Sequence, residues 1–129
     1  MIMDELYTFY TKKRQKCYVY TAIAITRYGK YYYFYYLSKY KSAKELFHFS
    51  IHLPTVDTIY CDGNMAYDNV FGHKAIMGKG KHTNIIENLN SQLRDNISYL
   101  VRKSKAHCKS LSWLNGRLAS FFNDKNSHL

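Results

Sequence analysis

The sequence predicts one α/β domain, in which a mixed sheet carries helices on both faces. A chain of 129 residues with 47% hydrophobic content can bury a core without disulfides or a structural metal. Its first part contains three successive strand patterns joined by short turns, and its second part alternates helical and strand patterns. Successive strands pair antiparallel and strands separated by a helix run parallel, so the sheet is expected to be mixed.

The first strand is predicted for residues 1–11, because the side chains alternate with a period of two. One side carries Ile2, Asp4, Leu6 and Thr8, and the other carries Met3, Glu5, Tyr7 and Phe9. Asp4 is the odd member of its side, an acid between Ile2 and Leu6. Its neighbour Glu5 must point to the opposite face.

The next two strands are predicted for residues 17–26 and 31–37. The polar run KKRQK precedes them, and the turn RYGK joins them, with Gly29 available for positive φ. The third strand, YYYFYYL, has two interpretations. It could be a stacking platform for nucleic-acid bases, or a sheet strand with one packed and one partly wet face. The second interpretation is favoured, because tyrosine suits both environments.

A helix with the sequence SAKELFHFSIHL follows, with Ser42 as N-cap, Glu45 at the capping-box position and Pro54 as its stop. His48 and His52 have the spacing of a metal pair, but no third ligand lies nearby, so we interpret the pair as incidental.

A buried strand is predicted for residues 55–61, ending on Asp62 and followed by the helix NMAYDNVF. An acid at the carboxyl end of a strand lies where open α/β sheets build their sites. The alternative is that Asp62 caps the helix that starts at Asn64. A strand over residues 74–77 and the basic loop GKGKH come next. That loop could hold a phosphate, although it matches no Walker pattern, or it could be a surface connection.

The longest helical period covers residues 82–103. Its apolar stripe contains Ile85, Ile86, Leu89, Leu93, Ile97, Leu100 and Val101. Beside that stripe lies a polar flank of Glu87, Asn90, Arg94 and Ser98, within roughly 80° at about 100° per residue. The alternative for Glu87 is a capping box with Asn84. A last amphipathic helix, in residues 105–122, is expected to bury Leu111, Leu114, Leu118, Phe121 and Phe122.

The charge balance points to a polyanionic partner. Nineteen Lys and Arg against nine Asp and Glu leave a net charge of +10, which favours nucleic acid before membrane, with a merely solvated basic surface as the alternative. Three distant cysteines without a CxxC pair argue against a disulfide framework or zinc knuckle and favour a reducing compartment. We find no signal-peptide pattern and no membrane-spanning run.

The chain resembles the catalytic part of a bacterial DDE transposase of the insertion-element-one family. The resemblance covers nearly all 129 residues and is carried by MDELYTF, IYCDGNMAY and NIIENLNSQLRDNISYLVRKS. It implies a single ribonuclease H-like catalytic domain over residues 1–129. It also implies three catalytic, metal-binding acids, Asp4, Asp62 and Glu87, which would hold two Mg²⁺ or Mn²⁺ ions.

The same resemblance implies that the protein cleaves the ends of an insertion element and joins their 3′-hydroxyls to target DNA. The implied partner is double-stranded DNA, bound by a homo-oligomer in the bacterial cytoplasm, with no membrane. The DNA-binding residues would be Asn90, Arg94, Lys79, Lys81, Arg102, Lys103 and Lys105.

The chain departs from the family in two places. The zinc-binding and helix-turn-helix region that precedes the catalytic part in the family is not expected here, and Asn88 and Leu89 follow the Glu where relatives often carry basic residues or His. Two other interpretations therefore stay open: a truncated remnant that no longer transposes, and a basic nucleic-acid-binding module without chemistry.

Overall fold

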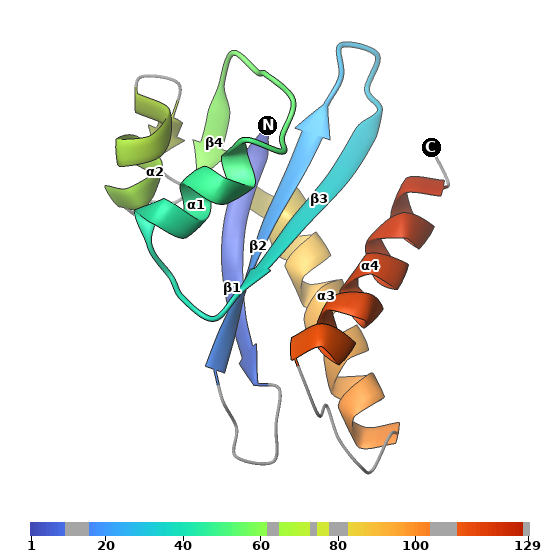
Figure 1. The fold of residues 1–129 in the computed structure, drawn as a ribbon. Helices are drawn as coiled ribbons and strands as arrows, with labels where there is room; N and C mark the ends of the chain where they lie inside the picture. Colours follow the sequence, from blue (N-terminus) through green and yellow to red (C-terminus); the bar gives the residue numbers. More distant parts are fainter. Residues whose placement is uncertain (10–15, 62–64, 73–74, 78–82, 104–110, 128–129) are drawn as a thin grey trace.

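The computed structural model describes residues 1–9, 16–61, 65–72, 75–77, 83–103 and 111–127 (Figure 1). The strands are β1 (Ile2–Phe9), β2 (Lys16–Ile25), β3 (Tyr31–Ser38), β4 (Ile59–Cys61) and β5 (Ala75–Met77). The helices are α1 (Ala43–Ser50), α2 (Met65–Phe71), α3 (Thr83–Lys103) and α4 (Leu111–Ser127). The predicted order of strands and helices is confirmed.

The sheet has the strand order β3-β2-β1-β4-β5. β1, β2 and β3 pair antiparallel, whereas β4 and β5 are parallel to β1 and to each other. Ile2 aligns with Tyr60, whose N–H donates to the carbonyl oxygen of Met1 at 2.8 Å. The mixed sheet is therefore confirmed, and β1 is its middle strand.

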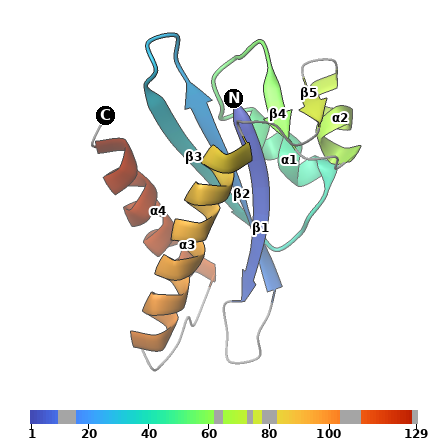
Figure 2. The same cartoon turned by 180° about the vertical axis from the view of Figure 1, so that it is seen from behind.

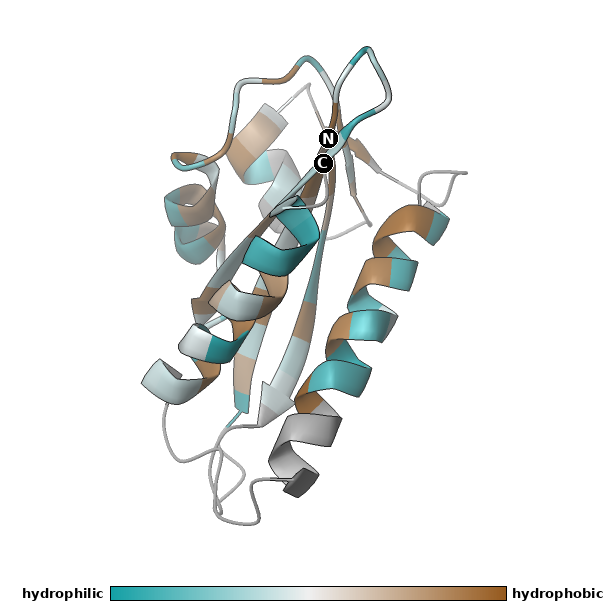
Figure 3. Cartoon of the chain, turned by 90° about the vertical axis from the view of Figure 1, so that its right-hand side faces the viewer, coloured by the Kyte–Doolittle hydropathy of each residue, from teal (hydrophilic) through white to brown (hydrophobic). Residues whose placement is uncertain are grey.

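Helices cover both faces of this sheet, as expected (Figures 1 and 2). On one face α3 and α4 contribute Ile86, Leu89, Leu93, Leu114, Leu118 and Phe122 to a buried cluster with Ile2, Leu6, Val19 and Ile23 of the sheet. On the other face α1 and α2 contribute Leu46, Phe49 and Tyr67 to a second cluster with Met3, Tyr20, Ala22 and Ile59. Hydrophilic and hydrophobic residues alternate along α3 and α4 (Figure 3), as expected of helices buried on one side.

The turn between β2 and β3 is built as the sequence predicts. Gly29 has a φ of 80°, a conformation that a residue without a Cβ adopts at low cost. The N–H of Gly29 donates to the carbonyl oxygen of Thr26 at 3.0 Å. The N–H of Thr26 donates to the carbonyl oxygen of Lys30 at 2.9 Å. The tight turn sets the register of β2 against β3, from Ile25 opposite Tyr31 onward.

The aromatic residues of β3 pack on both faces of the sheet. Tyr35 stacks on Phe122 of α4, with ring centroids 4.9 Å apart, and Tyr36 stacks on Phe49 of α1 at 6.0 Å. Most side chains of this strand are partly buried. The structure therefore agrees with a packed strand rather than an open stacking platform.

β3 is an edge strand, and a side chain binds the outward backbone groups of one of its residues. The amide of Asn126 in the last turn of α4 accepts from the N–H of Tyr33 and donates to the carbonyl oxygen of Tyr33, both at 2.9 Å. The two bonds reproduce those that a neighbouring strand would make at this position.

The structure corrects several element boundaries. α1 ends at Ser50, not at residue 53, because Ile51 forms the C-cap and the N–H groups of His52 and Leu53 turn back to Phe49 and Ser50. The helix thus ends before Pro54 could stop it. β4 is also shorter than residues 55–61, since it contains only Ile59–Cys61. α4 reaches Ser127, five residues beyond the predicted end.

Two predicted caps have different outcomes. Ser42 is the N-cap of α1, and its hydroxyl accepts from the N–H of Glu45 at 3.3 Å. The Glu45 carboxylate accepts instead from Tyr36 and Ser38, so only half of the capping box forms. α3 begins at Thr83, which places Asn84 inside the helix. A capping box between Asn84 and Glu87 is therefore not present.

Cys17 and Cys61 are buried in the two hydrophobic clusters, as small core residues. Cys108 lies outside the described residues. Among the helices that the structure describes, none combines the length and the apolar character required to cross a bilayer.

Leu93 is fully buried between α3 and the sheet, so its truncation tests this packing. We expect Leu93→Ala to lower the free energy of unfolding by about 2–5 kcal/mol, because the lost methyl groups leave a cavity. The neighbouring Gln92 is exposed, and Gln92→Ala should change the free energy of unfolding by less than about 0.5 kcal/mol. Urea unfolding of both variants measures the difference. Equal stabilities would contradict the placement of α3.

The buried tyrosines predict a loss of stability in alkaline solution. Burial raises the pKa of Tyr20 to about 12, from an ordinary value of 10.0. Burial also raises the pKa of Tyr33, Tyr35 and Tyr36. The unfolded chain therefore loses these protons at lower pH than the folded chain, so the stabilisation is complete below pH 10.0 and is lost as the pH rises toward about 12. Urea unfolding across this range should show falling stability, with a smaller slope in Tyr20→Phe. An identical slope in that variant would contradict the burial of the Tyr20 phenol.

Candidate active site

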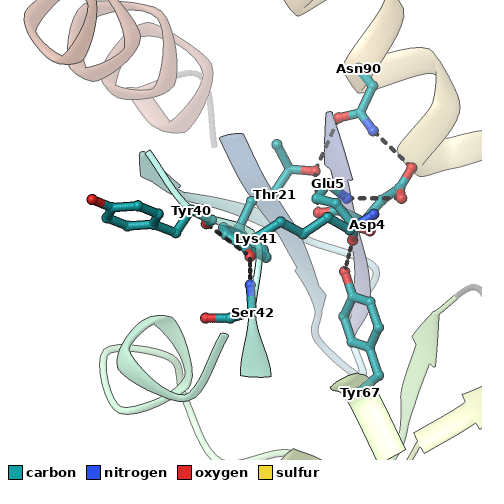
Figure 4. Close-up of polar contacts among 9 residues, drawn as sticks. Asp4, Glu5, Thr21, Tyr40, Lys41, Ser42, Tyr67 and Asn90 are labelled. Carbon is teal, nitrogen blue, oxygen red and sulfur yellow. Dashed lines mark hydrogen bonds and ion pairs between the residues drawn. The ribbon is translucent and has the colours of Figure 1, made fainter. Parts of the chain in front are cut away.

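Asp4 lies on the middle strand with its carboxylate turned toward α3 (Figure 4). Its Oδ1 accepts from the N–H of Glu5 at 2.8 Å, and its Oδ2 accepts from Nδ2 of Asn90 at 3.0 Å. The strand places it there because alternate residues of β1, Ile2 and Leu6, pack on the same face. The odd acid that the alternation singled out is thus held by two N–H donors beside the core.

Asn90 makes the bridge from α3 to the sheet. It is 2% exposed, and its Oδ1 accepts from the hydroxyl of Thr21 at 3.0 Å while its Nδ2 binds Asp4. Thr21 lies opposite Asp4 in the register of β1 and β2, and its hydroxyl is also 3.3 Å from the carbonyl oxygen of Asp4. Asn90 therefore ties the helix to both central strands.

The sequence predicted that Asn90 contacts DNA, and the structure places it differently. Its amide is directed into the protein and is occupied by Asp4 and Thr21. In the described residues, no buried polar side-chain atom lacks a hydrogen-bond partner. Asn90 is therefore placed to orient a carboxylate rather than to contact a DNA strand.

Glu87 and Arg94 flank Asn90 on α3, three residues before it and four residues after it. Both side chains are exposed, whereas Asn90 between them is buried. Of the polar flank that the sequence predicts, Asn90 is thus inside the protein and the charged Glu87 and Arg94 are at the surface, while the side chain of Ser98 lies outside the description. An acid and a guanidinium lie about one turn on either side of the residue that holds Asp4.

The remaining predicted site residues are only partly described. Asp62, Lys79, Lys81 and Lys105 lie outside the described residues, and Arg102 and Lys103 belong to the last turn of α3, without a description of their side chains. Asp62 directly follows Cys61, the last residue of β4. In the segments that are described, no three His, Cys, Asp or Glu side chains converge on a common point, and Asp62 is not among those segments.

The chemistry of the predicted acids fits a hard divalent cation. Mg²⁺ and Mn²⁺ prefer oxygen ligands, and carboxylates are the side chains that supply them most strongly. The orientation of the Asp4 carboxylate is fixed by the N–H of Glu5 and the amide of Asn90. Such outer partners of a ligand tune its affinity for a metal. The Asp4 carboxylate therefore suits a site of this kind.

Sequence reasoning missed the part played by Thr21. The segment AIAIT follows Thr21, and the register of the first hairpin decides that this residue faces Asp4. That register depends on how the segment between β1 and β2 is built, which the run KKRQK alone does not specify. The available signal was a polar residue in the middle of an otherwise largely apolar strand.

The contact between Asp4 and Asn90 predicts a pH-dependent defect in Asn90→Asp. A second carboxylate 3.0 Å from Asp4 would raise the pKa of one acid of the pair, because the two charges repel. Because the folded Asn90→Asp variant would bind the proton of that acid more tightly than its unfolded chain, the variant loses more stability as the pH rises through the range in which the two acids ionise.

Asn96 is exposed on the same helix, so Asn96→Asp adds the same charge without this contact. At neutral pH we expect Asn90→Asp to be less stable than Asn96→Asp by about 1–3 kcal/mol, and by less in acid, as measured by urea unfolding. Equal stability of the two variants at neutral pH would show that Asn90 does not hold Asp4.

Comparison with known proteins adds no family assignment. Neither a scan against protein-family models nor a search of curated proteins found a match for this chain. The functional interpretation therefore rests on the residues themselves, above all on the acid of the middle strand and the helix that binds it.

Proposed function

We propose that the chain is the catalytic domain of a DDE-type transposase, which cleaves DNA and transfers the freed strand to a target. The observation that carries this proposal is the position of Asp4 on the middle strand, held by an asparagine three residues beyond Glu87 on α3. Two of the three acids that the resemblance assigns to catalysis, Asp4 and Glu87, thus come from elements that bind each other directly.

The topology supports a ribonuclease H-like arrangement. Three antiparallel strands precede two parallel ones, the first strand lies in the middle, and helices cover both faces. This is the order expected of the fold that the resemblance implies. In that fold, acids from the first strand, the fourth strand and a following helix meet at one end of the sheet.

The parallel register of β1 and β4 supports a meeting of Asp4 with Asp62. Ile2 aligns with Tyr60, and Asp4 and Asp62 each lie two residues beyond that pair in the same direction. Continuation of the register would place the two acids side by side on strands about 4.8 Å apart. Glu87 would complete the group from α3.

In this proposal the residues of the chain hold the cations and the DNA. Asp4, Asp62 and Glu87 would hold two Mg²⁺ or Mn²⁺ ions, which activate the attacking oxygen and stabilise the leaving oxygen of an in-line displacement at phosphorus. Asn90 fixes the orientation of the Asp4 carboxylate. The attacking groups are water and then a DNA 3′-hydroxyl, so the protein needs no nucleophile of its own.

The basic residues supply affinity for double-stranded DNA. Arg94 is exposed one turn beyond Asn90, where a guanidinium could bind a phosphate next to the acids. The proposed phosphate contacts also include Lys79, Lys81, Arg102, Lys103 and Lys105. Phosphate contacts position DNA without reading its sequence, so the net charge of +10 supports binding rather than specificity. Transposition of two element ends would require a homo-oligomer.

Nicking of supercoiled plasmid DNA with Mg²⁺ or Mn²⁺ tests the proposal. We expect Asp4→Asn and Glu87→Gln to lower the nicking rate by about a hundredfold or more, because loss of even an outer partner of a metal ligand costs about 10- to 100-fold. Asp95→Asn is the matched control, since Asp95 is an exposed acid on the same helix, and it should nick like the unmodified chain.

Two outcomes would contradict the proposal. Unchanged nicking in Asp4→Asn and Glu87→Gln would indicate a contaminating nuclease. Salt-sensitive DNA binding without any nicking by the unmodified chain would favour a basic nucleic-acid-binding module or an inactive remnant.

A further inference from the structure

The face of β1 opposite Asp4 carries a second polar cluster, formed by Glu5, Tyr67 and Lys41. The Glu5 side chain is 6% exposed, and its Oε1 lies 3.1 Å from Nζ of Lys41. Its Oε2 accepts from the hydroxyl of Tyr67, a fully buried residue of α2. Figure 4 shows Tyr67 approaching Glu5 from one side while Asn90 approaches Asp4 from the other.

This cluster joins β1 to α2 and to the segment that precedes α1. Glu5 belongs to β1, Lys41 precedes the N-cap of α1, and Tyr67 lies in the first turn of α2. Removal of a carboxylate from water is costly unless it is paired and hydrogen-bonded. Because Lys41 and Tyr67 supply both kinds of contact, the Glu5 side chain is confined to one position.

The fixed position of Glu5 also restrains Asp4, because the backbone N–H of Glu5 binds the Asp4 carboxylate. The N–H of Glu5 donates to Oδ1 of Asp4 at 2.8 Å, and the two side chains point to opposite faces. A rotation of the peptide between them would move both Glu5 and the N–H that Asp4 accepts. The strand is thus held at this step from α3 on one face and from α2 on the other.

The same hydrogen bond anchors the start of α2. The helix begins at Met65, three residues after Asp62, and Tyr67 is its third residue. Its hydroxyl therefore links the helix that follows the second proposed acid to the strand residue next to the first. This one contact therefore restrains the strand that carries Asp4 and the helix that follows Asp62 in the sequence.

We infer that Tyr67 and Glu5 are positioning residues for the divalent-cation site, acting from the opposite face of the sheet. The inference rests on the proposed function. Tyr67 touches neither DNA nor cation in this scheme; it keeps the Asp4 carboxylate and the beginning of α2 in place. Its loss should weaken cation binding while DNA affinity stays the same.

The decisive comparison is between Tyr67→Phe and Tyr36→Phe. Tyr36 also donates its hydroxyl to a glutamate on this face of the sheet, at 3.2 Å from Glu45 Oε2, but Glu45 lies on α1 and is not adjacent to a proposed acid. Titration calorimetry with Mn²⁺ and the full chain gives a readout that does not depend on activity. We expect Tyr67→Phe to weaken Mn²⁺ binding about tenfold and Tyr36→Phe less than about twofold, by the usual size of such outer contacts.

A second variant, Lys41→Met, keeps the inference testable if Tyr67→Phe does not fold. Lys41 is 45% exposed, so its replacement leaves the core unchanged. Removal of a positive charge would by simple electrostatics strengthen binding of a cation. We expect instead that Mn²⁺ binding weakens about threefold, because Glu5 loses its ion pair with Lys41, an outer-shell effect below the usual range.

The outcomes separate the inference from the proposed function. If the unmodified chain takes up no Mn²⁺, with or without DNA, both fail. If it takes up Mn²⁺ and Tyr67→Phe binds it equally well, the positioning role alone fails. Equal weakening in Tyr67→Phe and Tyr36→Phe would indicate general loosening of this face and would also overturn the inference. Unchanged or stronger binding in Lys41→Met would do the same.

Discussion

The hydrogen bond between Asp4 and Asn90 is the constraint on which the rest of the arrangement depends. A carboxylate beside the hydrophobic core needs donors, and here one comes from the strand itself and one from a helix more than eighty residues away in sequence. Because Asn90 also accepts from Thr21, a single buried amide fixes the depth and rotation of α3 against two strands. The exposed positions of Glu87 and Arg94 follow from that fixed rotation.

Acidic side chains are held by hydrogen bonds on both faces of β1. Asp4 and Glu5 are adjacent acids, and each is satisfied by a different layer of the protein: Asn90 of α3 for Asp4, Tyr67 and Lys41 for Glu5. Strand alternation sends the two carboxylates apart, so they do not repel each other at close range. A middle strand that carries charge on both faces is thereby compatible with a packed core on both faces.

Much of the fold could be predicted from the sequence, because periodicity reports which side of an element is buried. The alternation around Asp4 and the long stripe from Ile86 to Ile97 were sufficient to place β1 and α3. The ends of the elements were less predictable. α1 ends at Ser50 because its own backbone forms turns there, and the position of Pro54 does not predict those turns. The inward position of Asn90 could not be predicted, since its partners are brought to it only by the register of β1 and β2. The contribution of Asp62 is still a prediction.

The capped residue of β3 has a consequence for how copies of this chain can associate. An exposed edge strand is a template for sheet extension between molecules, and natural proteins block such edges. Asn126 occupies both backbone groups of Tyr33, so an incoming strand would have to displace a side chain that already makes both bonds. Self-association through continuous intermolecular sheets is therefore disfavoured along this border. The opposite border of the sheet is β5, where Ile76 is 48% exposed.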